Sequence, residues 1–109
     1  MADHIPSQLK KGVLELCVLA LLAQGDSYAY DLARNLAQAV DMGEGTIYPL
    51  MRRLQTDGLV DSYQQESESG PSRKYYRLTE AGLLSLTAQK QDWQRFTASV
   101  NSILGVTHE

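Results

Sequence analysis

The first half of the chain carries apolar residues at the spacing of three successive helices. The first helix is predicted from about Ser7, a suitable N-cap, to Ala23, before the polar break at Gln24-Gly25-Asp26. Between Val13 and Leu22 it is apolar on nearly every side. Such a helix must be covered on more than one side, so in a domain this small we expect a second subunit to supply part of the cover.

The next two helices form a helix-turn-helix pattern. Ser27 can cap the second helix, which is predicted from about Tyr28 to Val40 and has an apolar stripe at helical spacing. Asp41-Met42-Gly43 is a short connection in which Gly43 can cap the third helix, and Asp57-Gly58 ends that helix. Two helices joined by a tight glycine-containing turn, the second with a polar outer face, are typical of a helix-turn-helix unit.

The third helix has the surface expected of a DNA recognition helix. Its buried side is predicted from apolar residues at i, i+3, i+4 and i+7, namely Ile47, Leu50, Met51 and Leu54. The opposite side is small at first and then hydroxylated and cationic, with Gly45, Thr46, Tyr48, Pro49, Arg52, Arg53 and Thr56. Small residues let a backbone approach the major groove, and arginine can donate two hydrogen bonds to guanine. An ordinary surface helix could carry the same pattern, so the segments that follow decide between the two interpretations.

The segment after the third helix predicts a β-hairpin wing. Residues 59–66 form the first predicted strand, 67–72 a turn rich in Ser, Gly and Pro, and 73–78 a second strand rich in aromatic residues. Arg73 and Lys74 open the returning strand, where a wing tip would meet the phosphate backbone of DNA. The wing favours the recognition-helix interpretation.

The last helix is predicted from the N-cap Thr79 to about Leu104, with Glu80 in its first turn. Its seam steps by three and four residues, through Leu83, Leu86, Lys90, Trp93, Thr97, Val100 and Leu104, with Phe96 and Ile103 beside it. The predicted domain leaves nothing for this helix to pack against, so we expect a dimerisation arm that pairs with the first helix of the partner. The predicted fold is mainly α with a small β-hairpin (α+β): a winged helix-turn-helix DNA-binding domain over residues 1–78 and a C-terminal dimerisation helix over 79–109, in one compact unit.

Charge alone argues mildly against a nucleic-acid partner. The chain has a net charge of −3 and a pI near 5.3, with 43% hydrophobic and 21% charged residues among its 109. The distribution of charge matters more than its sum. Cations gather in three clusters, which comprise Lys10, Lys11, Arg52, Arg53, Arg73, Lys74 and Arg77.

Several other classes of protein are disfavoured. The longest apolar run, residues 13–23, is too short to span a membrane, and no secretion signal opens the chain. The single cysteine, Cys17, excludes an internal disulfide, fits a reducing cytoplasm and is predicted to be core. His4 and His108 lie near the ends, and neither metal-ligand spacing nor a phosphate loop occurs. We therefore expect no enzyme activity, no metal and no cofactor.

Three motifs occur in a fixed order between Gly25 and Gly82. They are Gly-Asp-Ser-Tyr-Ala-Tyr-Asp-Leu at 25–32, Gly-Thr-Ile-Tyr-Pro-Leu-Met-Arg-Arg-Leu at 45–54 with Asp-Gly-Leu-Val at 57–60, and Arg-Lys-Tyr-Tyr-Arg-Leu-Thr-Glu-Ala-Gly at 73–82. With these motifs the chain resembles the PadR family of bacterial transcriptional regulators. Ala29 stands where glycine is commoner in that family.

The resemblance implies a cytoplasmic homodimer that represses transcription at a double-stranded DNA operator with two-fold symmetry. By position, Thr46, Tyr48, Pro49, Arg52 and Arg53 would lie at the major groove or its phosphates, and Tyr28, Arg73 and Lys74 would contact the DNA backbone. The chain resembles the short members of the family, in which the dimer interface itself would have to sense an effector.

Trp93 is the residue predicted to bind such an effector. It is the only tryptophan, lies in the middle of the last helix, and has the polar neighbours Lys90 and Thr97 in the seam. A planar aromatic small molecule could stack on the indole at the dimer centre. The alternative is that Trp93 only packs against the partner.

The main alternative for the whole chain is a winged-helix module that contacts another protein and does not bind DNA. Arg52, Arg53, Arg73 and Lys74 disfavour it, because the cores of protein interfaces are depleted of charge and of lysine.

Overall fold

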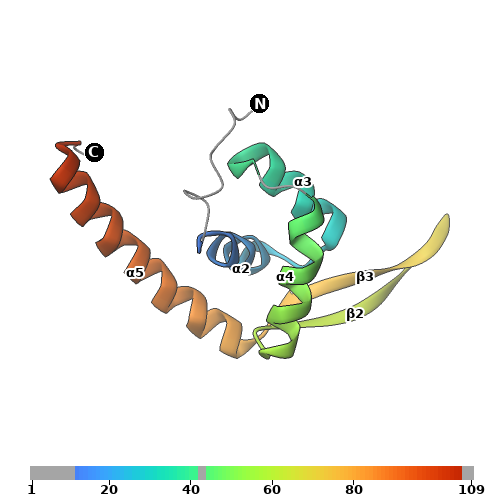
Figure 1. Ribbon diagram of the computed structural model, residues 1–109. Coiled ribbons are helices and arrows are strands. Elements are labelled where there is room, and N and C mark those ends of the chain that lie inside the picture. The colour runs from blue at the N-terminus through green and yellow to red at the C-terminus, as the bar shows by residue number, and fades with distance from the viewer. Residues whose placement is uncertain (1–11, 42–43, 107–109) are drawn as a thin grey trace.

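The computed structural model describes residues 12–41 and 44–106. A body of helices carries a wing of antiparallel strands, and a long last helix runs away from the body on the side opposite the wing (Figure 1). The elements in chain order are α2 (Leu14–Gln24), β1 (Ser27–Tyr28), α3 (Ala29–Val40), α4 (Glu44–Thr56), β2 (Val60–Ser67), β3 (Gly70–Leu78) and α5 (Glu80–Leu104). This order confirms the winged helix-turn-helix fold with a long C-terminal helix.

One apolar core lies where α2, α3 and α4 meet the base of the sheet. On α4, Ile47, Met51 and Leu54 are fully buried and Leu50 is half-buried, which confirms the predicted inner stripe. The rest of the buried core comprises Val18, Leu19, Leu22, Ala29, Leu32, Ala33, Leu36, Val60, Tyr76 and Leu86. Because burial of the stripe fixes the rotation of α4 about its axis, it also fixes which residues α4 presents outward.

The remaining sides of α2 are only partly covered by its own chain. Leu14, Leu16, Cys17, Ala20 and Leu21 are half-buried against the core. Burial raises the pKa of the Cys17 thiol, which keeps it neutral and unreactive, as expected of a packing residue. The predicted caps Ser7 and Gly43 lie outside the described residues.

The start of α3 differs from the prediction. Ser27 does not cap the helix; Ser27 and Tyr28 form the short strand β1, and α3 begins at Ala29 without a side-chain cap. β1 pairs with β3 through Ser27 opposite Tyr76 and Tyr28 opposite Tyr75, in a sheet of order β1-β3-β2. Pairing with the open edge of β3 gives the backbone groups of Ser27 and Tyr28 partners in the sheet, which favours the extended conformation at these two residues.

The wing is longer and its turn tighter than predicted. The strands continue to Ser67 and from Gly70, so Glu68 and Ser69 make the turn in place of the six residues expected. Pro71 lies within β3, which β1 borders only at Tyr75 and Tyr76. A proline without an N–H is tolerated where one edge of a strand has no partner, so it does not end the strand there.

The predicted ends of α5 are confirmed. The Thr79 hydroxyl accepts a hydrogen bond from the Gly82 amide at 3.0 Å, and Gly105 closes the other end in the left-handed conformation. The 25 residues span roughly 37 Å at the usual helical rise.

The first turns of α5 do find a partner within the chain, contrary to the prediction. Leu86 is buried in the core, and α2 packs along this part of α5. Beyond it, large apolar side chains are exposed: Trp93, Phe96, Ile103 and Leu104. Within the described ranges, no helix is both long and apolar enough to cross a membrane.

Candidate nucleic-acid interface

The outer face of α4 is open from its first turn to its last. Gly45, Tyr48, Pro49 and Arg52 are exposed, with Tyr48 50% accessible. A Cβ atom added at Gly45 would meet no atom within 4 Å, so another backbone could approach closely there. At the other end, Gln55 Nε2 donates to Ser62 Oγ at 2.9 Å and ties α4 to β2. No other element of the described ranges therefore covers this face, and the hydrogen bond to β2 holds its orientation.

The two adjacent arginines of α4 have different surroundings. Within the described part of the chain, Arg52 makes neither a hydrogen bond nor an ion pair. Arg53 Nη2 lies 2.8 Å from Glu15 Oε1, and its Nη1 lies 3.6 Å from Asp57 Oδ2. Thr46 is exposed on the same edge of α4 as Arg53, and both line a cavity of about 370 Å³ beside Glu15. The residues of α4 predicted to contact DNA thus form two groups. Tyr48, Pro49 and Arg52 lie on the outer face, and Thr46 and Arg53 lie on the edge beside Glu15.

The two cations of the wing are also separated. Arg73 and Lys74 lie opposite Gln65 and Gln64, partway along β3, whereas the turn carries Glu68. The prediction that they stand at the wing tip is wrong, because the strands extend beyond them. As neighbours in a strand they point to opposite faces of the sheet.

Each wing cation is stacked on a tyrosine. The Arg73 guanidinium lies 4.9 Å from the centre of the Tyr28 ring, and its Nη1 donates to the Tyr28 hydroxyl at 3.0 Å. Lys74 Nζ lies 5.5 Å from the centre of the Tyr76 ring on the other face. Tyr28 and Arg73 therefore form one unit, with the cation fixed against the ring that precedes α3.

Four tyrosines form a continuous row across the outer face of the sheet. The ring centres are 6.3 Å apart for Tyr30 and Tyr28, 5.4 Å for Tyr28 and Tyr75, and 5.8 Å for Tyr75 and Tyr63. Arg34 stacks at the Tyr30 end and Arg77 at the Tyr63 end. The row joins α3 to all three strands and so fixes the wing against the helix-turn-helix unit.

A hydrogen bond and an ion pair hold the Tyr63 end of the row. The Tyr63 hydroxyl donates to Asp26 Oδ2 at 2.7 Å, in the loop before β1. This hydrogen bond, more than partial desolvation or the Asp26 charge, raises the pKa of Tyr63. Arg77 Nη2 lies 3.8 Å from Asp61 Oδ2 across the strand pair. The cations without a carboxylate partner in the described ranges that border α4 and the wing are therefore Arg34, Arg52, Arg73 and Lys74.

The sequence also matches a known family over most of this architecture. The model of the transcriptional regulator PadR-like family matches residues 18–88, from α2 to the first turns of α5. The chain belongs to the PadR-like family. It is a transcriptional regulator with the family's winged helix-turn-helix fold.

Solved PadR-like structures share this fold over about nine tenths of the chain. A PadR-like transcriptional regulator from Bacillus cereus is 39% identical, with a TM-score of 0.82 over 89% of this chain and 96% of that one. A PadR-like transcription factor from Bacteroides fragilis is 40% identical, with a TM-score of 0.73 over 93% and 99% of the two chains. A transcriptional regulator of Mycobacterium tuberculosis is 28% identical over 94 residues, which are 85% of this chain and 87% of that one.

Sequence reasoning missed parts of this PadR-like interface. The alternation of Arg73, Tyr75 and Arg77 along the second predicted strand is a signal that could have shown that they share one face. Nothing in the pattern showed that Tyr28 and Tyr30 would continue that face, because β1 was predicted to be a helix start. The partners of Arg53 were missed for a similar reason, since Glu15 lies 38 positions earlier.

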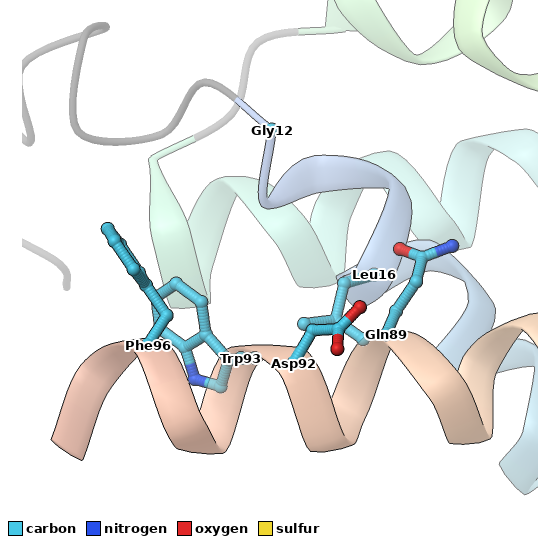
Figure 2. A pocket seen from close by; sticks show the side chains of 6 residues that line it. All are labelled: Gly12, Leu16, Gln89, Asp92, Trp93 and Phe96. Carbon is cyan, nitrogen blue, oxygen red and sulfur yellow. The ribbon is translucent and has the colours of Figure 1, made fainter. Parts of the chain in front are cut away.

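Trp93 borders an open cavity between α5 and the start of α2 (Figure 2). The cavity has a volume of about 250 Å³ and is lined by Gly12, Leu16, Gln89, Asp92, Trp93 and Phe96. Trp93 is 41% exposed and Phe96 63%. The hydroxyl of Thr97 donates to the Trp93 carbonyl at 2.9 Å, so it is bonded within its own helix. One protomer therefore supplies an indole, a phenyl ring and a carboxylate around this space.

Proposed function

We propose that this PadR-family chain regulates transcription by binding duplex DNA in a sequence-specific way, as a repressor. The observation that carries the proposal is the outer face of α4, which is open, small at its first turn, and presents an arginine that pairs with no residue in the described part of the chain. An unpaired guanidinium on a helix that fits the major groove can donate both hydrogen bonds to guanine O6 and N7.

The residues around α4 divide into those that meet bases and those that meet phosphates. We assign base contact to Arg52, with Tyr48 and Pro49 beside it at the groove and Thr46 at the helix start. Tyr28, Arg73 and Lys74 are assigned to the phosphate backbone, on the two faces of the wing. Arg53 borders the same groove, although its charge is paired in the free protein.

We further propose that the protein binds its operator as a homodimer joined through α5. The exposed apolar side chains of the distal half of α5 support this, as does a groove of about 590 Å³ between α2 and α3. That groove is bordered by Cys17, Ala20, Leu21, Leu36 and Val40. A two-fold dimer would place its two recognition helices on an operator with two-fold symmetry, with half-sites about 34 Å or one DNA turn apart.

A planar aromatic small molecule is proposed as the effector, bound between Trp93 and Phe96. Such an effector would release the protein from DNA only if it bound the free form of the protein more tightly than the DNA-bound form. The test is to titrate planar aromatic dyes while following tryptophan fluorescence, and then to repeat the titration with Trp93→Ala. No quenching, or an unchanged affinity in the variant, would leave Trp93 as a packing residue.

Selection of bound duplexes from a random DNA pool tests the central proposal. We expect an enriched motif with two related halves, and Arg52→Ala should relax the preference at one base of each half by roughly 1–3 kcal/mol. Equal loss on every sequence would show that Arg52 contacts phosphate. If no duplex is enriched and binding does not weaken with salt, the chain is a winged-helix module for protein contact.

A further inference from the structure

Glu15 of α2 has both of its carboxylate oxygens bonded to side chains of other helices. Oε1 accepts a hydrogen bond from Arg53 Nη2 of α4 at 2.8 Å, and Oε2 accepts one from Gln89 Nε2 of α5 at 2.7 Å. Gln89 Nε2 also donates to Ser85 Oγ at 2.9 Å. The Glu15 side chain is only 22% exposed, so this is a mostly covered carboxylate at the junction of three helices.

This carboxylate makes the two adjacent arginines of α4 unequal. Arg53 is held between Glu15 and Asp57, the residue that directly follows α4. Arg52 projects about 100° away around the helix and has no such partner among the described residues. A guanidinium that is already bonded to a carboxylate must give up that pair before it can neutralise a phosphate. In the free protein the charge of Arg53 is therefore not available to DNA, although the residue lies in the recognition helix.

We propose that Glu15 is a positioning residue that withholds Arg53 from the DNA phosphates and so limits the sequence-independent part of DNA affinity. The inference rests on the proposed function. It adds that Glu15 determines whether one or both arginines of α4 contact the DNA. A contact between Arg53 and a phosphate would strengthen binding to any duplex without adding base discrimination. Arg52 keeps its role at the bases.

Gln89 links the pairing of Glu15 with Arg53 to the position of α5. It fixes the second oxygen of Glu15 and also borders the Trp93 cavity, as Figure 2 shows. Without its N–H donor the Glu15 carboxylate is free to rotate, which weakens its hold on Arg53. A movement of α5 relative to α2 would act in the same way, so the position of the arm determines how firmly Arg53 is held.

The test is Glu15→Gln, which keeps the shape of the side chain and removes its charge. Affinity for a duplex of arbitrary sequence is measured between 50 and 200 mM salt. We expect tighter binding than in the wild type and a salt slope steeper by about 0.9, the value of one added phosphate contact. The advantage of the variant should therefore shrink by about threefold across that salt range.

Two controls separate release of Arg53 from a general change in charge. Glu80→Gln removes an exposed carboxylate in the first turn of α5 and changes the net charge equally; we expect its salt slope to match that of the wild type. Glu15→Gln made in an Arg53→Ala background should have no effect on affinity, because the cation to be released is absent. Gln89→Ala should change affinity in the same direction as Glu15→Gln but by less, and not at all in the Glu15→Gln background.

The outcomes are distinguishable. If the role of Glu15 is only structural, Glu15→Gln should lower the melting temperature and leave DNA binding weaker or unchanged. That result, obtained with folded wild-type and variant proteins, overturns this inference but leaves the proposed function standing. An effect of Glu15→Gln that persists in the Arg53→Ala background overturns it as well. A wild type that does not bind duplex DNA in a salt-dependent way removes the proposed function and this inference together. If Glu15→Gln does not fold, the comparison of Gln89→Ala with wild type decides in its place.

Discussion

The Tyr28 hydroxyl and ring hold Arg73 from two directions. The ring lies under the guanidinium, and the hydroxyl accepts a hydrogen bond from Nη1 at 3.0 Å. An arginine fixed in this way loses less side-chain freedom when it meets a phosphate than a solvated one does. The role of this cation therefore depends on a residue 45 positions away in the chain.

Tyr28→Phe should separate the hydroxyl from the ring. We expect affinity for two unrelated duplexes to fall by about two- to tenfold, the range of one lost hydrogen bond, while the free energy of unfolding changes by less than about 0.5 kcal/mol. Filter binding and thermal unfolding measure the two quantities. Tyr30→Phe is the matched control, because no described residue hydrogen-bonds the Tyr30 hydroxyl. A loss confined to one duplex would instead make Tyr28 a base contact.

Tyr63 gives the wing a dependence on alkaline pH. Its hydrogen bond to Asp26 raises the pKa of its hydroxyl above the usual value of about 10. The contribution of this hydrogen bond to the stability of the folded protein is therefore complete below the pKa that Tyr63 has in the unfolded chain. It is lost as pH rises through the higher pKa that Tyr63 has in the folded protein. Thermal unfolding between pH 8 and about 11.5 should show a loss of stability above about pH 10. We expect this loss to be smaller in Tyr63→Phe than in the wild type; equal losses would exclude a contribution from this bond.

At the scale of elements, the junction between the wing and α5 is closely packed. Leu59 O accepts a hydrogen bond from the Thr79 amide at 3.1 Å, and the Thr79 hydroxyl donates to Gly58 O at 2.7 Å. Gly82 is buried directly against this corner, where a Cβ would overlap Leu59 O and Leu78 Cδ1. Backbone cannot move aside as a flexible side chain can. The absence of a side chain at Gly82 thus lets the arm start where the wing ends.

Gly82→Ala should destabilise the protein by about 1–3 kcal/mol, the usual cost of overpacking. The matched control is Gly45→Ala, in a helix as well but with open space around the added methyl group. That change should leave stability unchanged or raise it by up to about 1 kcal/mol. Urea unfolding of both variants provides the measurement. Equal effects at the two sites would show that the corner can relax.

At the scale of the whole molecule, the wing and the arm project from opposite sides of one body (Figure 1). The first turns of α5 pack on α2 through Leu86, and the distal half leaves Trp93, Phe96, Ile103 and Leu104 exposed. Apolar side chains gathered on one side of an extended helix are typical of an interface. The two halves of α5 therefore differ: the first packs on α2 within the chain, and the second carries the exposed apolar row that we propose as the dimer interface.

Val100→Asp should convert the proposed dimer to monomer, because a charge in the apolar row would be desolvated without a partner. Sedimentation at micromolar concentration measures the change, and DNA affinity should fall with it. Ser102→Asp adds the same charge on the other side of α5 and should leave the dimer intact. A Val100→Asp protein that remains dimeric would assign the interface to α2.

The sequence by itself determined the order of the helices and of the two long strands of the wing, the inner stripe of α4 and both ends of α5. These features depend on spacing and on caps within a few residues of one another, such as Thr79 with Gly82 and the left-handed glycines at 58 and 105. The three family motifs are local in the same sense. They identified a PadR-like regulator without reference to any long-range contact.

Only the tertiary structure decided which cations are free and where the wing ends. Arg52 and Arg53 are equivalent in sequence, and Glu15 and Asp57 make them different. Ser27 and Tyr28, the predicted cap and first residue of a helix, form a strand because β3 offers them an unpaired edge, and that pairing aligns the tyrosines into one row. The burial of Leu86 likewise needed α2 and α5 to meet in space. Each of these outcomes depends on partners distant in the chain, and neither propensity nor periodicity carries that information.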